Sequence, residues 1–206
     1  MHPVKPITTG EGGMLTTNDE ELATRARRFR NHGIDSDHRQ RQQQGSWYYE
    51  MIELGYNYRL TDLQCALGRS QLEKLPAWIE RRRAIAAMYD GAFASVSALT
   101  PLKRVPGTES AHHLYVVQLN LERLARGRQD VFRALQAEGI GVNVHYVPVH
   151  LHPFYRHRFG TGPGLCPVAE AAYERMLTLP LTHAMSDGDV DDVVTAVDKV
   201  LSAYSG

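Results

Sequence analysis

The sequence predicts an α/β protein, because strand-like and helix-like apolar patterns alternate along the second half of the chain. Residues 113–119 form an apolar run typical of a buried strand, and residues 129–138 have the period of an amphipathic helix that Gly139 ends. Residues 142–146 are a second strand-like run, so this stretch indicates a βαβ-like unit. With 206 residues, 43% of them hydrophobic, the chain can bury a core.

The first part of the chain is predicted to contain one short strand and two helices. Residues 13–17 are expected to form the strand, and the acidic cap after it begins a helix that runs to about Arg30. Residues 34–46 are rich in Gln, Arg and Asp, which favours a mobile surface loop. Thr61 caps the second helix, which Pro76 is expected to kink or restart.

A loop and two helices are predicted around the βαβ-like stretch. Residues 95–110 contain Pro101 and a Pro-Gly pair and are expected to be a loop. Residues 168–176 have a helical pattern, and Ser186 caps a final helix. The apolar stripe of that last helix consists of Val190, Val193, Val194, Val197, Val200 and Leu201.

The charge balance gives no reason to expect a polyanionic partner. The 23 basic and 23 acidic side chains cancel, which argues against nucleic acid or an anionic membrane as a partner. No apolar run reaches the roughly 18 residues that cross a bilayer, and no signal segment opens the chain, so a cytoplasmic protein is expected. Cys65 and Cys166 lie far apart in sequence, which predicts two reduced thiols.

Lys5 is the leading functional candidate, because it stands between two prolines in the segment HPVKPITTGEGG. Pro6 disfavours helix at the preceding residue, so the lysine amine should lie on a stiff, non-helical segment. Most lysines are solvated surface charges, and spacing alone does not select this one. The glycines that follow allow two interpretations, a backbone nest for phosphate or a tight turn, and the lack of Walker-loop order favours the turn.

This segment, together with the following MLTTND, resembles the Schiff-base lysine segment of the DegT/DnrJ/EryC1/StrS sugar aminotransferases. Three later stretches are similar to the same family: RNHG at 30–33, WYYEMIELGYNYRLTD at 47–62 and VHYVPVH at 144–150. Together they span almost the whole chain. Within the family, the sequence is most similar to the branch that aminates the C4 keto group of a UDP-linked 4-keto-6-deoxy hexosamine.

The resemblance implies a pyridoxal phosphate (PLP) enzyme that transfers an amino group, from glutamate, to a nucleotide-linked keto sugar. Lys5 would form the Schiff base and move protons, and its being lysine favours transamination, because dehydrating relatives carry His there. Asn57 would reach the cofactor phosphate of a partner subunit in a homodimer. Arg59, His145 and Tyr146 would bind the sugar nucleotide. From the residues alone, the favoured interpretation is that Asn57 stabilises a turn and Arg59 is a surface charge.

A cluster of histidines near the end of the 144–150 segment raises the question of a metal site. His145, His150, His152 and His157 have no cysteine or acidic residue nearby in sequence, so no metal is expected. The last three are interpreted as polar loop residues.

The resemblance also implies a fold and a domain division. The chain is expected to be the carboxy-terminal portion of an aspartate-aminotransferase-like (PLP fold type I) α/β protein. Residues 1–75 would be the end of the large domain with its connecting helix, and residues 76–206 the small carboxy-terminal domain. Relatives carry a long segment before the lysine that supplies the acid for the pyridine nitrogen and most of the phosphate cup. A fragment without these groups has a second interpretation, a non-catalytic oligomerisation or interaction domain.

Overall fold

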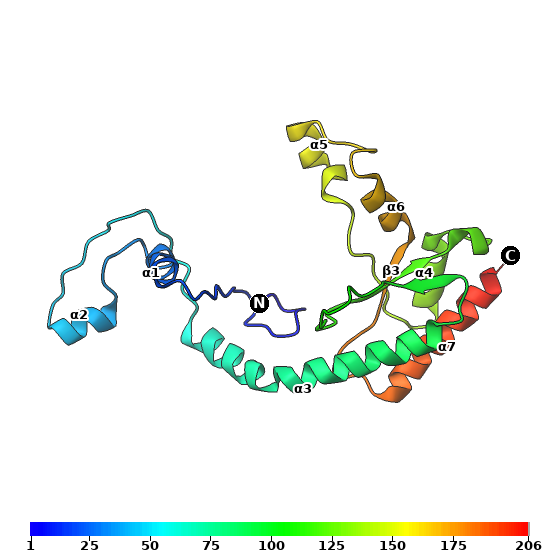
Figure 1. Ribbon diagram of the computed structural model, residues 1–206, viewed down its shortest axis with the longest axis horizontal. Helices are drawn as coiled ribbons and strands as arrows, with labels where there is room; N and C mark the ends of the chain where they lie inside the picture. The colour runs from blue at the N-terminus through cyan, green and yellow to red at the C-terminus, as the bar shows by residue number, and fades with distance from the viewer. Residues whose placement is uncertain (206) are drawn as a thin grey trace. The chain divides into compact units, whose positions relative to one another are not determined.

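The computed structural model describes residues 1–205, which form two compact units, from Met1 to Leu75 (unit 1) and from Pro76 onward (unit 2) (Figure 1). Helix α3, Asp62–Phe93, runs through the boundary and contributes to both units. It continues through Pro76 as one helix, so a restart at this proline is not observed.

Unit 2 is built on a three-stranded antiparallel sheet with the order β1-β2-β3. Its strands are β1 (Leu99–Pro101), β2 (Tyr115–Leu119) and β3 (Met176–Leu179). Leu99 pairs with Leu119, and Tyr115 pairs with Leu179. The central strand β2 has the expected period of two, because Tyr115, Val117 and Leu119 are buried while the residues between them are partly exposed.

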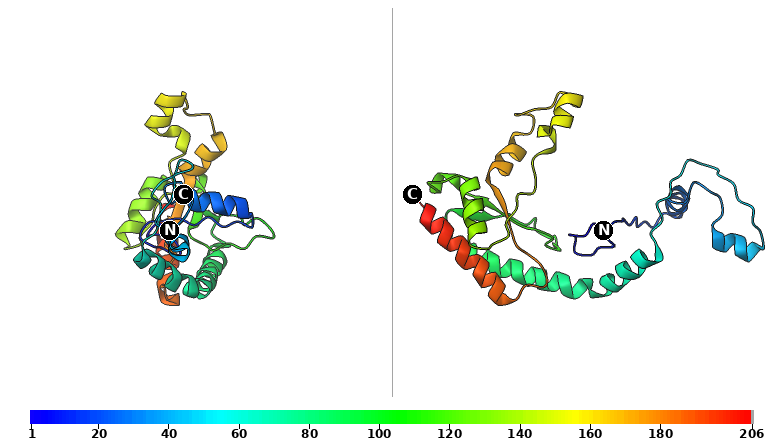
Figure 2. Two further views of the ribbon diagram at one scale, coloured as in Figure 1. Left: turned by 90° about the vertical axis from the view of Figure 1, so that its left-hand side faces the viewer. Right: turned by 180° about the vertical axis from the view of Figure 1, so that it is seen from behind.

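The end of α3 and two of the helices that follow it pack with this sheet to form one hydrophobic core. The helices of unit 2 after α3 are α4 (Arg128–Ala137), α5 (Pro153–Phe159), α6 (Pro167–Arg175) and α7 (Asp187–Tyr204), with 3₁₀ turns at Leu121–Arg123 and Val149–Leu151. Helices α4 and α7 contact each other, and α5 and α6 form an arm that extends from the sheet with α5 at its far end (Figure 2). The core side chains of the unit come from the end of α3, the sheet, α4 and α7, for example Ile85, Tyr89, Val117, Leu135 and Val197.

The prediction of a second strand at residues 142–146, which would complete a βαβ-like unit, is wrong. Residues 142–146 are not a strand, and only Asn143 bridges the sheet, through Thr178 of β3 at N···O distances of 3.1 and 2.7 Å. Strand β3 pairs with β2 on one side and with Asn143 on the other, so it lies between them. The Asn143 side chain accepts the backbone N–H of Val144 at 2.7 Å.

The cap residues correctly predicted where several helices begin. Asp19 accepts from the Leu22 amide at the start of α1 (Glu20–Phe29), and Ser186 forms a capping box at the start of α7. At the start of α3, the backbone N–H of Gln64 donates to the Thr61 hydroxyl at 3.3 Å. The stripe predicted for α7 is confirmed, because all of its members pack in or against the core.

Three other predictions about loops and strands are wrong. Within the polar stretch 34–46 lies the helix α2 (His38–Gln44), and Asp37 and Gln40 form a capping box around its first turn. Residues 13–17 are exposed and belong to no strand of the described chain, since a strand needs a neighbouring backbone to pair with. The predicted loop 95–110 contains the edge strand β1, which ends at Pro101.

Two simpler expectations can be compared directly with the structure. Both cysteines, Cys65 and Cys166, are free, as predicted, and the structure shows that both are exposed. Among residues 1–205, no helix combines the length and the apolar character needed to cross a bilayer.

We expect unit 2 to lose stability as the pH falls below about 6.5. Burial, reinforced by nearby Arg104, lowers the pKa of His112 from 6.5, and burial also lowers the pKa of His183. The unfolded chain therefore takes up protons more readily than the folded one, so stability is full above the unfolded pKa and declines as the pH falls towards the folded pKa. Chemical unfolding at pH 7.5 and 5.5 should show a loss of up to about 1 kcal/mol.

Replacing His112 with asparagine tests this pH dependence, because asparagine does not titrate and tolerates the positive φ of 45° at this position. His112→Asn should reduce the pH dependence to the part that His183 contributes, whereas the same change at exposed His38 should leave it intact. An unchanged pH slope in His112→Asn would rule out this histidine as the titrating group.

Candidate functional site

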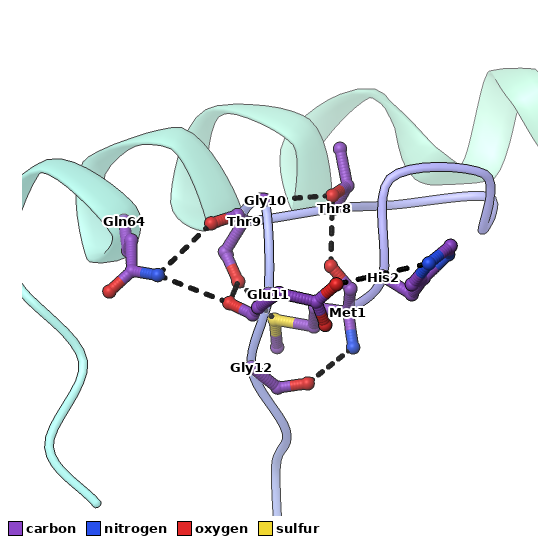
Figure 3. Close-up of polar contacts among 8 residues, drawn as sticks. All are labelled: Met1, His2, Thr8, Thr9, Gly10, Glu11, Gly12 and Gln64. Carbon is purple, nitrogen blue, oxygen red and sulfur yellow. Dashed lines mark hydrogen bonds and ion pairs between the residues drawn. The ribbon is translucent and has the colours of Figure 1, made fainter.

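Lys5 lies in a loop that closes on itself at the start of unit 1. Its amide donates to the carbonyl of His2 at 3.0 Å, and the Thr9 amide donates to the carbonyl of Met1 at 3.1 Å. The Met1 ammonium reaches the carbonyl of Gly12 at 2.5 Å (Figure 3). Residues 3–7 form turns and bends, so Lys5 lies on a non-helical segment as expected, and it is exposed.

The Lys5 loop, residues 1–12, is fixed to one face of α3. Thr9 is only 3% exposed, and it fits against the helix because a Cβ at Gly68 would lie 2.9 Å from its methyl group. The Gln64 Nε2 donates to the carbonyls of Thr9 and Glu11 at 3.3 and 3.2 Å (Figure 3). Further along the helix, Gln71 Oε1 accepts from the Thr8 amide at 2.9 Å. These contacts anchor the loop that carries the lysine to the first turns of α3.

The glycine-rich end of the loop has the geometry of a tight turn. Gly10 and Gly12 have φ values of 80° and 144°, which favour glycine. A Cβ at Gly12 would also lie 2.8 Å from Leu60 Cδ2. The Gly10 amide donates to the Thr8 hydroxyl at 2.9 Å, so it is already used within the turn. The turn, and not a phosphate nest, is the interpretation that these contacts support.

Asn57 and Arg59 lie on a segment that pairs with the end of α1. Asn57 bridges Asn31, and the Tyr58 amide donates to the carbonyl of Arg30 at 2.9 Å. Arg59 Nη1 donates to Asn31 Oδ1 at 2.5 Å, which fixes the guanidinium next to the RNHG stretch. Both Asn57 and Arg59 are exposed. The pairing therefore presents an amide and a guanidinium directly before the start of α3.

His145 and Tyr146 lie side by side in unit 2. His145 Nδ1 is 2.9 Å from the Thr178 hydroxyl of β3, and the two aromatic rings are edge to face at 4.6 Å. Tyr146 is 67% exposed, and the backbone continues from it into the arm of α5 and α6. The geometry is that of a supported imidazole next to an exposed phenol.

The other histidines include one that the sequence analysis assigned wrongly. His150 is not simply a polar loop residue, because its Nε2 lies 2.8 Å from Glu170 Oε1 on α6. Glu170 also accepts from the Gly164 and Cys166 amides, and these hydrogen bonds lower its pKa. The partner is twenty residues away and so escaped a search for nearby acids. Within residues 1–205, no cluster of His, Cys, Asp or Glu suited to a metal ion is found.

The structure thus groups the candidate residues within each unit. Lys5 lies in a loop anchored on α3, and Asn57 and Arg59 immediately precede the same helix. His145 and Tyr146 adjoin each other in unit 2. An open cavity of about 1980 Å³ in unit 1 is lined in part by Arg59 and Gln64, but Lys5 and Asn57 are not among its lining residues.

The donor set of unit 1 fits an aldehyde and a phosphate group. A primary amine, an amide and a guanidinium are the chemical groups that would attach an aldehyde and bind a phosphate. Gln64, Gln71 and Asn31 hold the segments that carry these donors in place, and none of the three was predicted to have that role. The Thr-x-x-Gln signature of a capping box at Thr61 is the signal that marks Gln64 as a structural residue.

The α/β fold with its lysine-bearing loop is that of the PLP-type aminotransferases. The DegT/DnrJ/EryC1/StrS aminotransferase family matches residues 1–198, and the chain belongs to this family. It is 36% identical over 209 residues to the UDP-4-amino-4,6-dideoxy-N-acetyl-beta-L-altrosamine transaminase of Campylobacter jejuni, covering 100% of this chain and 53% of that protein.

Two solved structures show the same likeness. Helicobacter pylori PseC, an aminotransferase involved in the biosynthesis of pseudoaminic acid, has a TM-score of 0.86 at 31% identity, over 98% of this chain and 52% of that one. Spr1654 of Streptococcus pneumoniae in its PLP form has a TM-score of 0.83 at 31% identity, over 98% and 50%. The chain spans about half the length of the curated relatives it matches.

Proposed function

We propose that this chain is the lysine-bearing part of a PLP-dependent sugar aminotransferase. Its reaction would transfer an amino group from glutamate to a nucleotide-linked 4-keto-6-deoxy sugar. The observation that carries the proposal is the exposed Lys5 in a loop anchored on α3, in a chain that belongs to an aminotransferase family. Two findings support the cofactor and the substrate class, the PLP form of Spr1654 and the nucleotide-sugar transaminase of Campylobacter jejuni.

The residues of this chain have distinct roles in the proposal. PLP, when bound, supplies an electron sink for the carbon that loses its proton. The Lys5 amine would hold the cofactor through its aldehyde and, when free, would move a proton from one carbon centre to the other. In a homodimer, the Asn57 side-chain amide would donate a hydrogen bond to the cofactor phosphate of the neighbouring subunit. Arg59, His145 and Tyr146 hold the sugar nucleotide by charge and hydrogen bonds.

The proposal also assigns the two units. Residues 1–75 correspond to the end of the large cofactor domain, and residues 76–206 to the small domain. The continuous helix α3, which belongs to both, supports its interpretation as the connecting helix.

One observation favours a second candidate, a non-catalytic interaction domain. In residues 1–75, only Thr9 and Gly33 are buried, and none of the apolar side chains is. Large apolar side chains of this unit are strongly exposed, such as Trp47 at 84% and Met14 at 72%. A surface of this kind is typical of an interface that another polypeptide covers.

Labelling of Lys5 decides between the two candidates. The chain has four lysines, so treatment with PLP and borohydride followed by mass spectrometry can assign every label. We expect the label on Lys5 to exceed that on Lys74, Lys103 and Lys199 by about tenfold, because of these four residues only Lys5 lies in the segment that the proposal assigns to the cofactor. Lys5→Arg should remove this excess, and Lys74→Arg should preserve it.

A different distribution would favour the interaction domain. If all four lysines of the wild-type chain are labelled equally, Lys5 has no special affinity for the aldehyde, and the catalytic proposal is overturned.

A further inference from the structure

The side chain of Gln64 connects two parts of unit 1 that the proposed function uses. Its Oε1 accepts from the Thr61 amide at 3.0 Å and from the Thr61 hydroxyl at 3.2 Å. Its Nε2 donates to the carbonyls of Thr9 and Glu11 at 3.3 and 3.2 Å (Figure 3). One side chain therefore caps α3 and holds the loop of Lys5.

Only an amide can serve both sets of partners. The capping side needs an acceptor for the Thr61 donors, and the loop side needs a donor for two carbonyl oxygens. Turning the amide over would place an oxygen against both carbonyls and an NH₂ group against the Thr61 amide. The two sets of partners thus fix the orientation of the Gln64 side-chain amide as well as the identity of the residue.

We propose that Gln64 is a positioning residue for the Lys5 amine. Its hydrogen bonds fix the Lys5 loop to the first turn of α3, so the backbone that carries the amine is held on a rigid element. This inference rests on the proposed function of Lys5. Holding a reacting group on a rigid element reduces the entropy lost when it reaches its target, and two hydrogen bonds contribute enough to shift a docked loop by about tenfold.

Gln64→Glu separates the two roles of this side chain. The carboxylate still accepts from the Thr61 donors, because glutamate is a normal partner in a capping box. On the loop side, however, it faces two carbonyl oxygens without a proton to donate, so the Lys5 loop should detach while α3 stays capped.

Gln71→Glu is the matched control. Gln71 stands two helical turns further along α3 and contacts the same loop, but through its Oε1, which accepts from the Thr8 amide at 2.9 Å. The substitution introduces the same charge on the same helix and keeps this acceptor. We expect it to leave the loop docked.

Two measurements on the 206-residue chain test the proposal. Amide hydrogen exchange of Thr8 and Thr9 should rise about tenfold in Gln64→Glu, because undocking exposes both amides. Borohydride-trapped PLP on Lys5 should fall by about the same factor relative to Lys74, Lys103 and Lys199, with the helix content by circular dichroism unchanged. Gln71→Glu should match the wild type in both measurements.

Each outcome decides one question. Wild-type exchange and labelling in Gln64→Glu would overturn the positioning role, and so would equal effects of the two substitutions. The proposed function is judged separately, because it fails if wild-type Lys5 is labelled no more than the other lysines, whatever the exchange rates show.

Discussion

Replacing Arg82 with methionine is expected to destabilise unit 2 by about 3 kcal/mol. Arg82 is only 6% exposed, and its Nη1 donates to the carbonyls of His112 at 3.1 Å, Leu181 at 2.9 Å and His113 at 3.4 Å. Burial lowers the pKa of Arg82, which reflects the cost of placing its charge away from water. Methionine keeps most of the apolar stem but leaves buried carbonyls without a donor, and relief of the charge burial offsets only part of that loss.

The neighbouring Arg83 provides the control for this experiment. Its guanidinium is much more exposed, and it bonds Glu109 and the carbonyl of Ser110 at the surface. Arg83→Met should therefore cost less than about 1 kcal/mol. Urea unfolding followed by circular dichroism measures both variants. A loss in Arg82→Met no greater than in Arg83→Met would mean that the three carbonyls do not depend on this arginine.

Local sequence signals were enough to predict elements that are stabilised by their own residues. The helix α7 is the clearest case, because Ser186 caps it and its valines repeat with the helical period. The helix α2 was not predicted, because its segment has no apolar face and only a capping box marks its start. Periodicity finds helices that bury a stripe, and it misses those that lie on the surface.

Elements that depend on distant partners could not be predicted in this way. The strand β3 has four residues and follows α6 directly, and its place between β2 and Asn143 is set by segments more than thirty residues away. The same holds at the candidate site. The motif around Lys5 pointed to the residue itself, whereas its support comes from Gln64 and Gln71, far along the chain. Long-range contacts of single side chains leave no periodic signal in a sequence.

The segment that carries Asn57 should detach when Gly33 is replaced with alanine. Gly33 and Gly55 bring two backbones into contact, and a Cβ at Gly33 would lie 1.8 Å from the carbonyl oxygen of Glu53. That distance is far inside any allowed contact, so the two backbones must separate. The Ile52 amide then loses its acceptor, the Gly33 carbonyl at 2.9 Å, and the pairing that holds Asn57 against Asn31 is broken.

Gly45→Ala isolates this clash from ordinary backbone strain. Gly33 and Gly45 have nearly the same φ, 69° and 63°, but a Cβ at Gly45 meets no atom within 4 Å. Both substitutions incur the cost of about 1 kcal/mol for a side chain in the left-handed region, and only Gly33→Ala adds the collision. Hydrogen exchange of the Tyr56 and Tyr58 amides, which donate to the carbonyls of Phe29 and Arg30, should rise at least about tenfold in Gly33→Ala and stay unchanged in Gly45→Ala. Equal exchange of these two amides in both variants would show that the Gly33–Gly55 contact does not hold the Asn57 segment in place.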